Sequence, residues 1–216
     1  MMLKLDIHVH TVHSDGRGTV EQVLNVAKSK GLDGLAITDH DTLRGYFEAM
    51  GLGADLVILP GYEVETDVGH MLVLGLEELP PAIVDVKYED LVTWSRGLGG
   101  LVVFAHPATG RVRMERLMRC KPDAVEVFNA SYPMLRFFVN RGLRISKGLG
   151  VPGLGGSDAH RPKDIGEAYT IVEVDGARRD DIIRSIREGK VRFEGKLSPV
   201  MIRLRAGIGY AISRAL

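Results

Sequence analysis

Apolar runs alternate with amphipathic stretches along most of the chain. Strands are predicted where apolar residues cluster between turn residues, at 3–9, 35–37, 56–59, 71–74, 101–104, 124–128, 151–154 and 168–174. Helices are predicted at 20–30, 46–50, 88–98, 114–119, 135–147 and 180–188. Thr19 is a typical N-cap for the first helix, and Gly31 a typical stop. The tail from residue 199 gives a weaker pattern.

Strands that alternate with helices indicate an α/β fold built from βαβ units around a parallel sheet. An open doubly wound sheet usually carries a glycine-rich phosphate loop after its first strand, whereas this first strand ends in histidines. Polar residues also follow several later apolar runs, as at the C-terminal face of a barrel. We therefore expect a distorted or incomplete TIM-like barrel of about seven strands, with its site at the C-terminal ends of the strands.

Composition narrows the class of protein further. The 216 residues, 45% of them hydrophobic, suit one domain over 1–216. The 28 basic residues balance the 28 acidic ones, so no global charge attracts nucleic acid or an anionic membrane. The single cysteine, Cys120, fits a small buried side chain in a reducing compartment, with a reactive thiol as the alternative. No run reaches membrane-spanning length, and we expect a cytoplasmic protein with no obligate protein partner.

Histidines and carboxylates recur at the ends of the apolar runs. His8 and His10 lie one residue apart, so on a strand both side chains point to the same face and can bind one cation. Similar positions hold four more histidines and three carboxylates: His40, His70, His106, His160, Asp15, Glu63 and Asp158. So many buried polar groups at one barrel end would need cations to satisfy them.

The ligand types indicate which metal chemistry to expect. Nitrogen and oxygen ligands without a nearby cysteine suit Zn, Mn or Fe. Nine ligands are too many for one ion that keeps a water, so two or three divalent ions are predicted. In such a cluster a bridging hydroxide, formed from a shared water near neutral pH, attacks phosphorus while the ions hold the phosphate oxygens.

Seven short motifs occur in order between residues 3 and 175: His8-Val9-His10, Ser14-Asp15-Gly16, Thr38-Asp39-His40-Asp41, Gly61-Tyr62-Glu63, Gly69-His70, Ala105-His106-Pro107 and Gly156-Ser157-Asp158-Ala159-His160. They resemble the successive motifs of the PHP (polymerase and histidinol phosphatase) superfamily. The resemblance implies a distorted (β/α)7 barrel and a trinuclear phosphoesterase site. It also implies the distribution of ligands: His8, His10, Glu63 and Asp158 on one ion, Asp15, His40 and His160 on a second, and Glu63 bridging to a third held by His70 and His106.

The expected reaction is metal-dependent hydrolysis of a phosphomonoester, in a nucleotide or another small phosphometabolite such as histidinol phosphate. The alternative substrate is the terminal phosphodiester of a short oligonucleotide, because the Ser-Asp-Gly and Thr-Asp-His-Asp-Thr variants resemble PHP phosphoesterases that act on nucleotides and RNA 5′ ends. Arg161 and Lys163 follow His160 directly and are expected to meet the phosphate, as is Asn129 at a strand end.

Other polar residues have two possible roles each. Asp39 and Asp41 flank His40 and could orient a ligand, although Asp41 could instead cap a helix. His13 lies outside the strand-end pattern and is expected at the rim rather than on a metal.

A local basic run also has two interpretations: Arg111, Arg113, Arg116, Arg119 and Lys121. It could be a solvated helix face or a track for RNA. The second interpretation keeps a different class open, an RNA-binding scaffold resembling the PHP-like protein subunit of RNase P. That subunit lacks the full ligand set, whereas all nine ligand positions are filled here.

Overall fold

The computed structural model describes residues 1–132 and 135–195, so the tail from residue 199 lies outside the described part. The strands are β1 (Met2–Val9), β2 (Gly34–Ile37), β3 (Val57–Thr66), β4 (Gly69–Leu74), β5 (Leu101–Phe104), β6 (Ala124–Asn129), β7 (Gly153–Gly156), β8 (Ala168–Glu173) and β9 (Val191–Gly195). The α-helices are α1 (Val20–Ser29), α2 (Arg44–Leu52), α3 (Tyr88–Gly97), α4 (Met114–Arg119), α5 (Leu135–Leu149) and α6 (Arg179–Arg187). Two 3-10 turns, η1 (Pro107–Thr109) and η2 (Pro162–Asp164), follow β5 and β7. None of the helices in the described ranges is long and apolar enough to cross a membrane.

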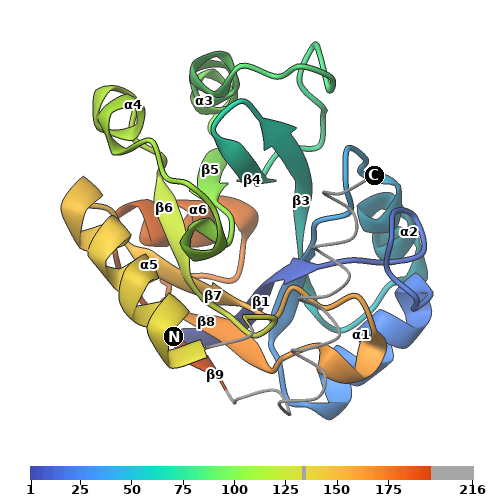
Figure 1. The fold of residues 1–216 in the computed structure, drawn as a ribbon. Helices are drawn as coiled ribbons and strands as arrows, with labels where there is room; N and C mark the ends of the chain where they lie inside the picture. Colours follow the sequence, from blue (N-terminus) through green and yellow to red (C-terminus); the bar gives the residue numbers. More distant parts are fainter. Residues whose placement is uncertain (133–134, 196–216) are drawn as a thin grey trace.

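All nine strands form one sheet in the order β7-β6-β5-β4-β3-β2-β1-β8-β9. The two ends of this sheet curl toward each other (Figure 1). The Thr170 hydroxyl on β8 donates to the Gly155 carbonyl on β7 and accepts from the Gly155 amide, both at 2.9 Å. Val9, at the end of β1, also pairs with Ala159 just beyond β7. These contacts nearly close the sheet, and the predicted α/β barrel is confirmed.

The strand number and directions differ from the prediction. The sheet has nine strands rather than about seven, and four of the eight pairings are antiparallel. Two of the antiparallel pairings arise because β3 continues through Pro60 and Gly61 for ten residues and returns as β4 through a tight turn. The other two arise because β8 runs antiparallel to both β1 and β9, the latter a strand that the sequence pattern does not predict. A hairpin reverses direction without a helix, so the alternation of strands and helices does not reveal it.

The helices lie around the outside of the strands (Figure 1). Thr19 begins α1 as predicted: its hydroxyl accepts from the Gln22 amide at 3.3 Å, and the Gln22 side chain accepts from the Thr19 amide at 3.1 Å. The buried side chains of α1 recur every three or four residues: Val20, Val23, Leu24 and Ala27. Burying each of the larger ones stabilises the fold by roughly 1.5–3 kcal/mol.

Candidate metal centre

Nine histidine and carboxylate side chains gather at one end of the barrel. His8 lies in β1, His10 and Asp15 follow it, His40 follows β2, Glu63 lies in β3, His70 is near the start of β4, His106 follows β5, and Asp158 and His160 follow β7. Because β4 is antiparallel to β3 and β5, its first residues lie beside the last residues of those strands. The structure therefore brings together every residue that the sequence predicts as a ligand.

Glu63 is buried at the centre of this cluster. Its Oε1 lies 2.7 Å from His70 Nδ1 and 2.9 Å from His106 Nε2. A second set of imidazoles lies 3.2–3.6 Å from Oε2: His8, His10 and His40. The two oxygens thus face two different sets of histidines, an arrangement suited to a carboxylate shared between two cations.

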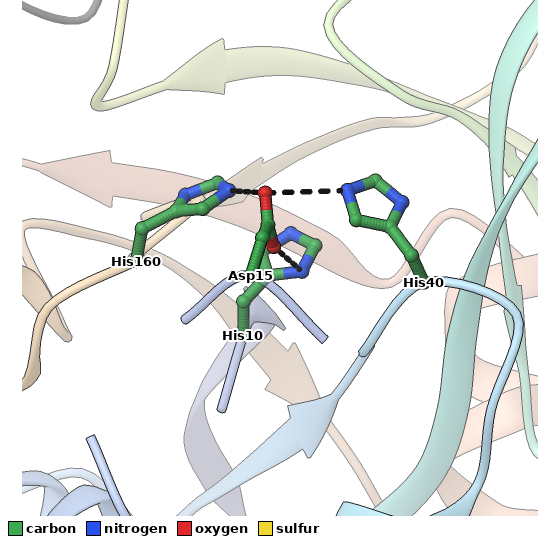
Figure 2. A group of neighbouring side chains, drawn as sticks. All are labelled: His10, Asp15, His40 and His160. Carbon is green, nitrogen blue, oxygen red and sulfur yellow. Dashed lines mark hydrogen bonds and ion pairs between the residues drawn. The ribbon is translucent and has the colours of Figure 1, made fainter. Parts of the chain in front are cut away.

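Asp15 lies between three imidazoles on the outer side of the cluster (Figure 2). Its Oδ2 is 3.0 Å from His160 Nε2 and 3.8 Å from His40 Nε2, and its Oδ1 is 3.5 Å from His10 Nδ1. His10 directs its other nitrogen, Nε2, toward Glu63 Oε2 at 3.3 Å. The Asp15 side chain is 53% exposed, whereas that of Glu63 is 2% exposed.

Asp158 completes the inner side of the cluster. Its Oδ1 lies 3.5 Å from His8 Nε2, 3.4 Å from His10 Nε2 and 3.6 Å from His160 Nδ1. Asp158 has a φ of 52° and His106 a φ of 28°, conformations that side-chain-bearing residues rarely adopt. Backbone strain of this kind persists only where the surrounding contacts hold it.

Glu126 and Asn129 on β6 lie directly behind these ligands, and both are fully buried. Glu126 Oε1 lies 2.9 Å from His8 Nδ1, and its Oε2 accepts from the His106 amide at 2.8 Å and from Asn129 at 3.0 Å. Asn129 also donates to Asp158 Oδ2 at 3.2 Å. The Asn129 amide is thus bonded within the cluster, and its predicted contact with substrate stays a prediction. The role of Glu126 is absent from the sequence-based prediction, although a carboxylate within an apolar strand was a signal for it.

The acidic and imidazole groups shift one another's pKa values. Burial alone would raise the pKa of Glu63 and of Asp158, but the charge of His8 and bonds with neighbouring imidazoles hold both well below their ordinary value. Burial alone would lower the pKa of His160, but its hydrogen bond to Asp15 and the nearby carboxylates raise it to about 9. Burial also opposes the ionisation of Asp15, yet the bond with His160 lowers the Asp15 pKa to about 2. The cluster therefore favours bound positive charge.

These donors fit divalent metal ions. His8 Nε2 and His10 Nε2 lie 3.1 Å apart, and oxygens of Glu63 and Asp158 lie 3.2–3.5 Å from them. His10 Nδ1 is buried without a hydrogen-bond partner among the described residues. Lone pairs concentrated in this way need protons or cations between them. Four overlapping groups of at least three ligand atoms lie close enough to share an ion, while the number and identity of the ions stay predictions.

Asp39 acts on the loop after β1 rather than on the neighbouring His40. It is fully buried and accepts from the Thr11 amide at 2.7 Å, the Thr11 hydroxyl at 2.6 Å and the Ser14 hydroxyl at 2.7 Å. This loop carries Asp15, so Asp39 fixes the position of a ligand that is distant from it in sequence.

Asp41 is linked to the cluster through its backbone. Its amide donates to the Glu63 carbonyl at 2.9 Å, and its φ is 55°. Burial and the charge of Glu63 raise the pKa of Asp41. The alternative role as a helix cap is wrong, because the N-cap of α2 is Leu43.

The predicted substrate-binding residues Arg161 and Lys163, and the predicted rim residue His13, have different surroundings. Arg161 donates from Nε to Asp164 at 2.8 Å, and Lys163 is exposed. Phosphate binding by these two residues stays a prediction. His13 Nε2 lies 2.6 Å from Glu48 and belongs to none of the candidate ligand groups in the described part of the chain, and the expectation that it binds no metal stays a prediction.

Two members of the basic run are paired with acidic residues. Arg116 bonds to Glu89 and, at 3.1 Å, to Asp67, and Arg119 bonds to Glu115 at 2.5 Å. For these two arginines the geometry favours the solvated helix face over an RNA track. Nucleic-acid binding by the rest of the run stays a prediction.

Two family models match the chain: PHP domain at residues 6–106, and PHP_C, described as PHP-associated, at residues 139–191. An uncharacterized protein of Methanocaldococcus jannaschii is 33% identical over 146 residues, which cover 59% of this chain and 82% of that protein. A phosphoribosyl 1,2-cyclic phosphate 1,2-diphosphodiesterase of Eggerthella lenta is 43% identical over 86 residues. That match covers 36% of this chain and 33% of the enzyme, so the chain spans about a third of the enzyme's length.

A solved structure from Bacteroides vulgatus shares the fold. It is a two-domain protein that contains a predicted PHP-like metal-dependent phosphoesterase, with a TM-score of 0.77 and 18% sequence identity. The similarity covers 91% of this chain and 65% of that one. Ordered motifs, a nearly closed barrel, nine converging candidate ligands and two family matches agree: the chain belongs to the PHP superfamily.

Proposed function

We propose that this chain hydrolyses phosphate esters with two or three divalent ions. The observation that carries this proposal is Glu63, whose two oxygens face two sets of imidazoles within a cluster of nine ligand residues. The ions would be held as follows: one by His8, His10, Glu63 and Asp158, one by Asp15, His40 and His160, and one by Glu63, His70 and His106. Divalent ions in such a site neutralise charge on a phosphoryl group and lower the pKa of a water molecule.

The proposed substrate is a small phosphomonoester, such as a nucleotide, with the terminal phosphodiester of a short oligonucleotide as the second choice. The exposed Asp15 group supports access of a small substrate from solvent. Arg161 and Lys163 follow His160 closely in the sequence, and arginine matches the geometry of phosphate, which supports a role for them in binding it. The name of the Eggerthella lenta relative adds cyclic phosphodiesters to the substrates worth testing.

A metal-reconstitution assay tests this proposal. Chelator-treated protein is reloaded separately with Mn, Zn or Fe and assayed against phosphomonoesters, cyclic phosphodiesters and short oligonucleotides. We expect stoichiometric metal and metal-dependent release of phosphate or of a shortened product, with His13→Ala active and Asp158→Asn inactive. Metal-loaded protein that cleaves no member of the panel would contradict the proposal. RNA binding without stoichiometric transition metal would instead indicate the scaffold class.

A further inference from the structure

We infer that Glu126 is a positioning residue that selects the proton position on His8 and holds His106 in its strained conformation. This inference rests on the proposed metal centre, and it concerns a residue that supplies no atom to any of the candidate ligand groups. Both of its oxygens are instead occupied behind the ligands, at the distances given above.

The contact with His8 determines which imidazole nitrogen carries a proton. Glu126 Oε2 already accepts two N–H groups, so we infer that Oε1 accepts as well and that the 2.9 Å contact places a proton on His8 Nδ1. His8 Nε2 is then free to present its lone pair toward Glu63 and Asp158. A carboxylate behind a metal-binding histidine commonly fixes the ring and its tautomer in this way.

The second oxygen of Glu126 acts on other members of the same group. It accepts the His106 amide, at a residue whose φ of 28° needs external contacts to persist. It also accepts from Asn129, which donates in turn to Asp158. His8, His106 and Asp158 form one of the four candidate ligand groups, and the Glu126–Asn129 pair contacts all three.

Space for the contact between Glu126 Oε1 and His8 depends on Gly156. A Cβ atom at this position would lie 2.7 Å from Glu126 Oε1 and 2.7 Å from the Cβ of His8. Real Cβ atoms do not approach neighbours so closely, so a larger residue would separate the carboxylate from the imidazole. The absence of a side chain at Gly156 on β7 thus permits the hydrogen bond between His8 on β1 and Glu126 on β6.

Glu126→Gln is the informative variant, because it keeps the volume and removes one acceptor. If the amide oxygen faces His106 and Asn129, its NH2 group faces His8 Nδ1 and moves the His8 proton to Nε2. In the opposite orientation the NH2 group would face two hydrogen-bond donors, the His106 amide and the Asn129 side chain, which is less favourable in free energy. We therefore expect the His8 tautomer to invert and the affinity for one zinc ion to fall by about tenfold to a hundredfold.

The test combines zinc titration against a competing chelator with two-bond ¹H–¹⁵N correlation spectra of histidine-labelled protein. Glu173→Gln is the matched control, because Glu173 is an exposed glutamate on β8. The spectra are recorded on zinc-free protein at a pH at which His8 is neutral. We expect the His8 proton on Nδ1 in the wild type and the control, and on Nε2 in Glu126→Gln. Equal zinc affinity and the same tautomer in all three proteins would overturn the inference.

The wild-type spectrum alone is also decisive if Glu126→Gln fails to fold, because His8 Nδ1 without a proton would overturn the inference. The possible results distinguish the inference about Glu126 from the proposed phosphoesterase function. Zinc binding without hydrolysis of any phosphate ester would remove the function and leave the positioning role of Glu126. If the wild type hydrolyses a phosphate ester but has the same zinc affinity and His8 tautomer as Glu126→Gln, the proposed function stands and the positioning role of Glu126 is refuted.

Discussion

Glu63 and His70 face each other diagonally across the β3–β4 hairpin, with 2.7 Å between Oε1 and Nδ1. In the register of this hairpin Glu65 lies opposite His70, so Glu63 is two residues further along the same face. Alternation of side chains along each strand places both residues on the same face of the hairpin. The hairpin therefore fixes Glu63 at the centre of the ligand cluster.

Glu63→Gln should release more than one metal ion. The substitution removes the negative charge that both sets of imidazoles share, so the repulsion between two nearby cations is poorly offset. Elemental analysis of the purified variant against the wild type measures the loss. His13→Ala is the control and should keep full metal content and near-normal activity, because His13 pairs with Glu48 outside the cluster. Equal loss in the two variants, or loss of one ion at most from Glu63→Gln, would exclude a bridging Glu63.

Asp39→Asn should destabilise the protein by about 1–3 kcal/mol in chemical denaturation. The carboxylate accepts three hydrogen bonds from Thr11 and Ser14, whereas an asparagine has one acceptor oxygen and leaves a buried donor facing its NH2 group. Asp55→Asn is the matched control, because Asp55 forms only an exposed pair with Lys28. Equal unfolding free energies in the two variants would show that Asp39 does not hold the loop.

Metal-free protein should lose thermal stability as the pH rises from about 6.5 to 9. The pKa of His160 is 6.5 ordinarily and about 9 in the fold, so its stabilisation is complete below 6.5 and disappears as the pH rises through 9. The pKa of His8 is also raised, in the same direction. The melting temperature of chelator-treated wild type should therefore fall across this window, and that of His160→Gln should fall less. Identical slopes for the two proteins would contradict the assignment.

Arg161→Ala should lower kcat/KM by about tenfold or more while metal content stays unchanged. A charge-assisted hydrogen bond to the substrate phosphate contributes about 1.5–3 kcal/mol, and its loss gives this reduction. Arg161 is bonded to Asp164, so Asp164→Asn is a control that keeps the arginine and its charge. Steady-state kinetics of both variants check the prediction, and an Arg161→Ala enzyme with wild-type kinetics would refute it.

The sequence predicts the ligands because their positions follow from local rules. Alternation along a strand places His8 and His10 on one face, and their Nε2 atoms indeed lie 3.1 Å apart. The strand-end rule likewise finds His40, His106 and Asp158. It does not explain His70, which comes near the start of an antiparallel strand, because the hairpin is hidden in an apolar run through Pro60 and Gly61.

The residues that support the ligands are harder to predict. Asp39 bonds to residues 25 and 28 positions away, and Glu126 bonds to His8 across 118 positions. Such pairs depend on the curvature of the sheet and on space left at Gly156, which no local pattern encodes. For Asp39, the sequence suggested a role in orienting a ligand but not the loop partners Thr11 and Ser14.

The order of the ligands along the chain has a consequence for biosynthesis. Two of the four candidate ligand groups, His8-His10-Glu63 and His40-Glu63-His70, are complete once residue 70 has been made, whereas the other two need residues 158 or 160. Since the chain leaves the ribosome from its N-terminus, ions can reach half of the centre long before the last strands emerge. A nascent chain that stalls near residue 150 would thus contain these histidines and Glu63 but lack Asp158 and His160.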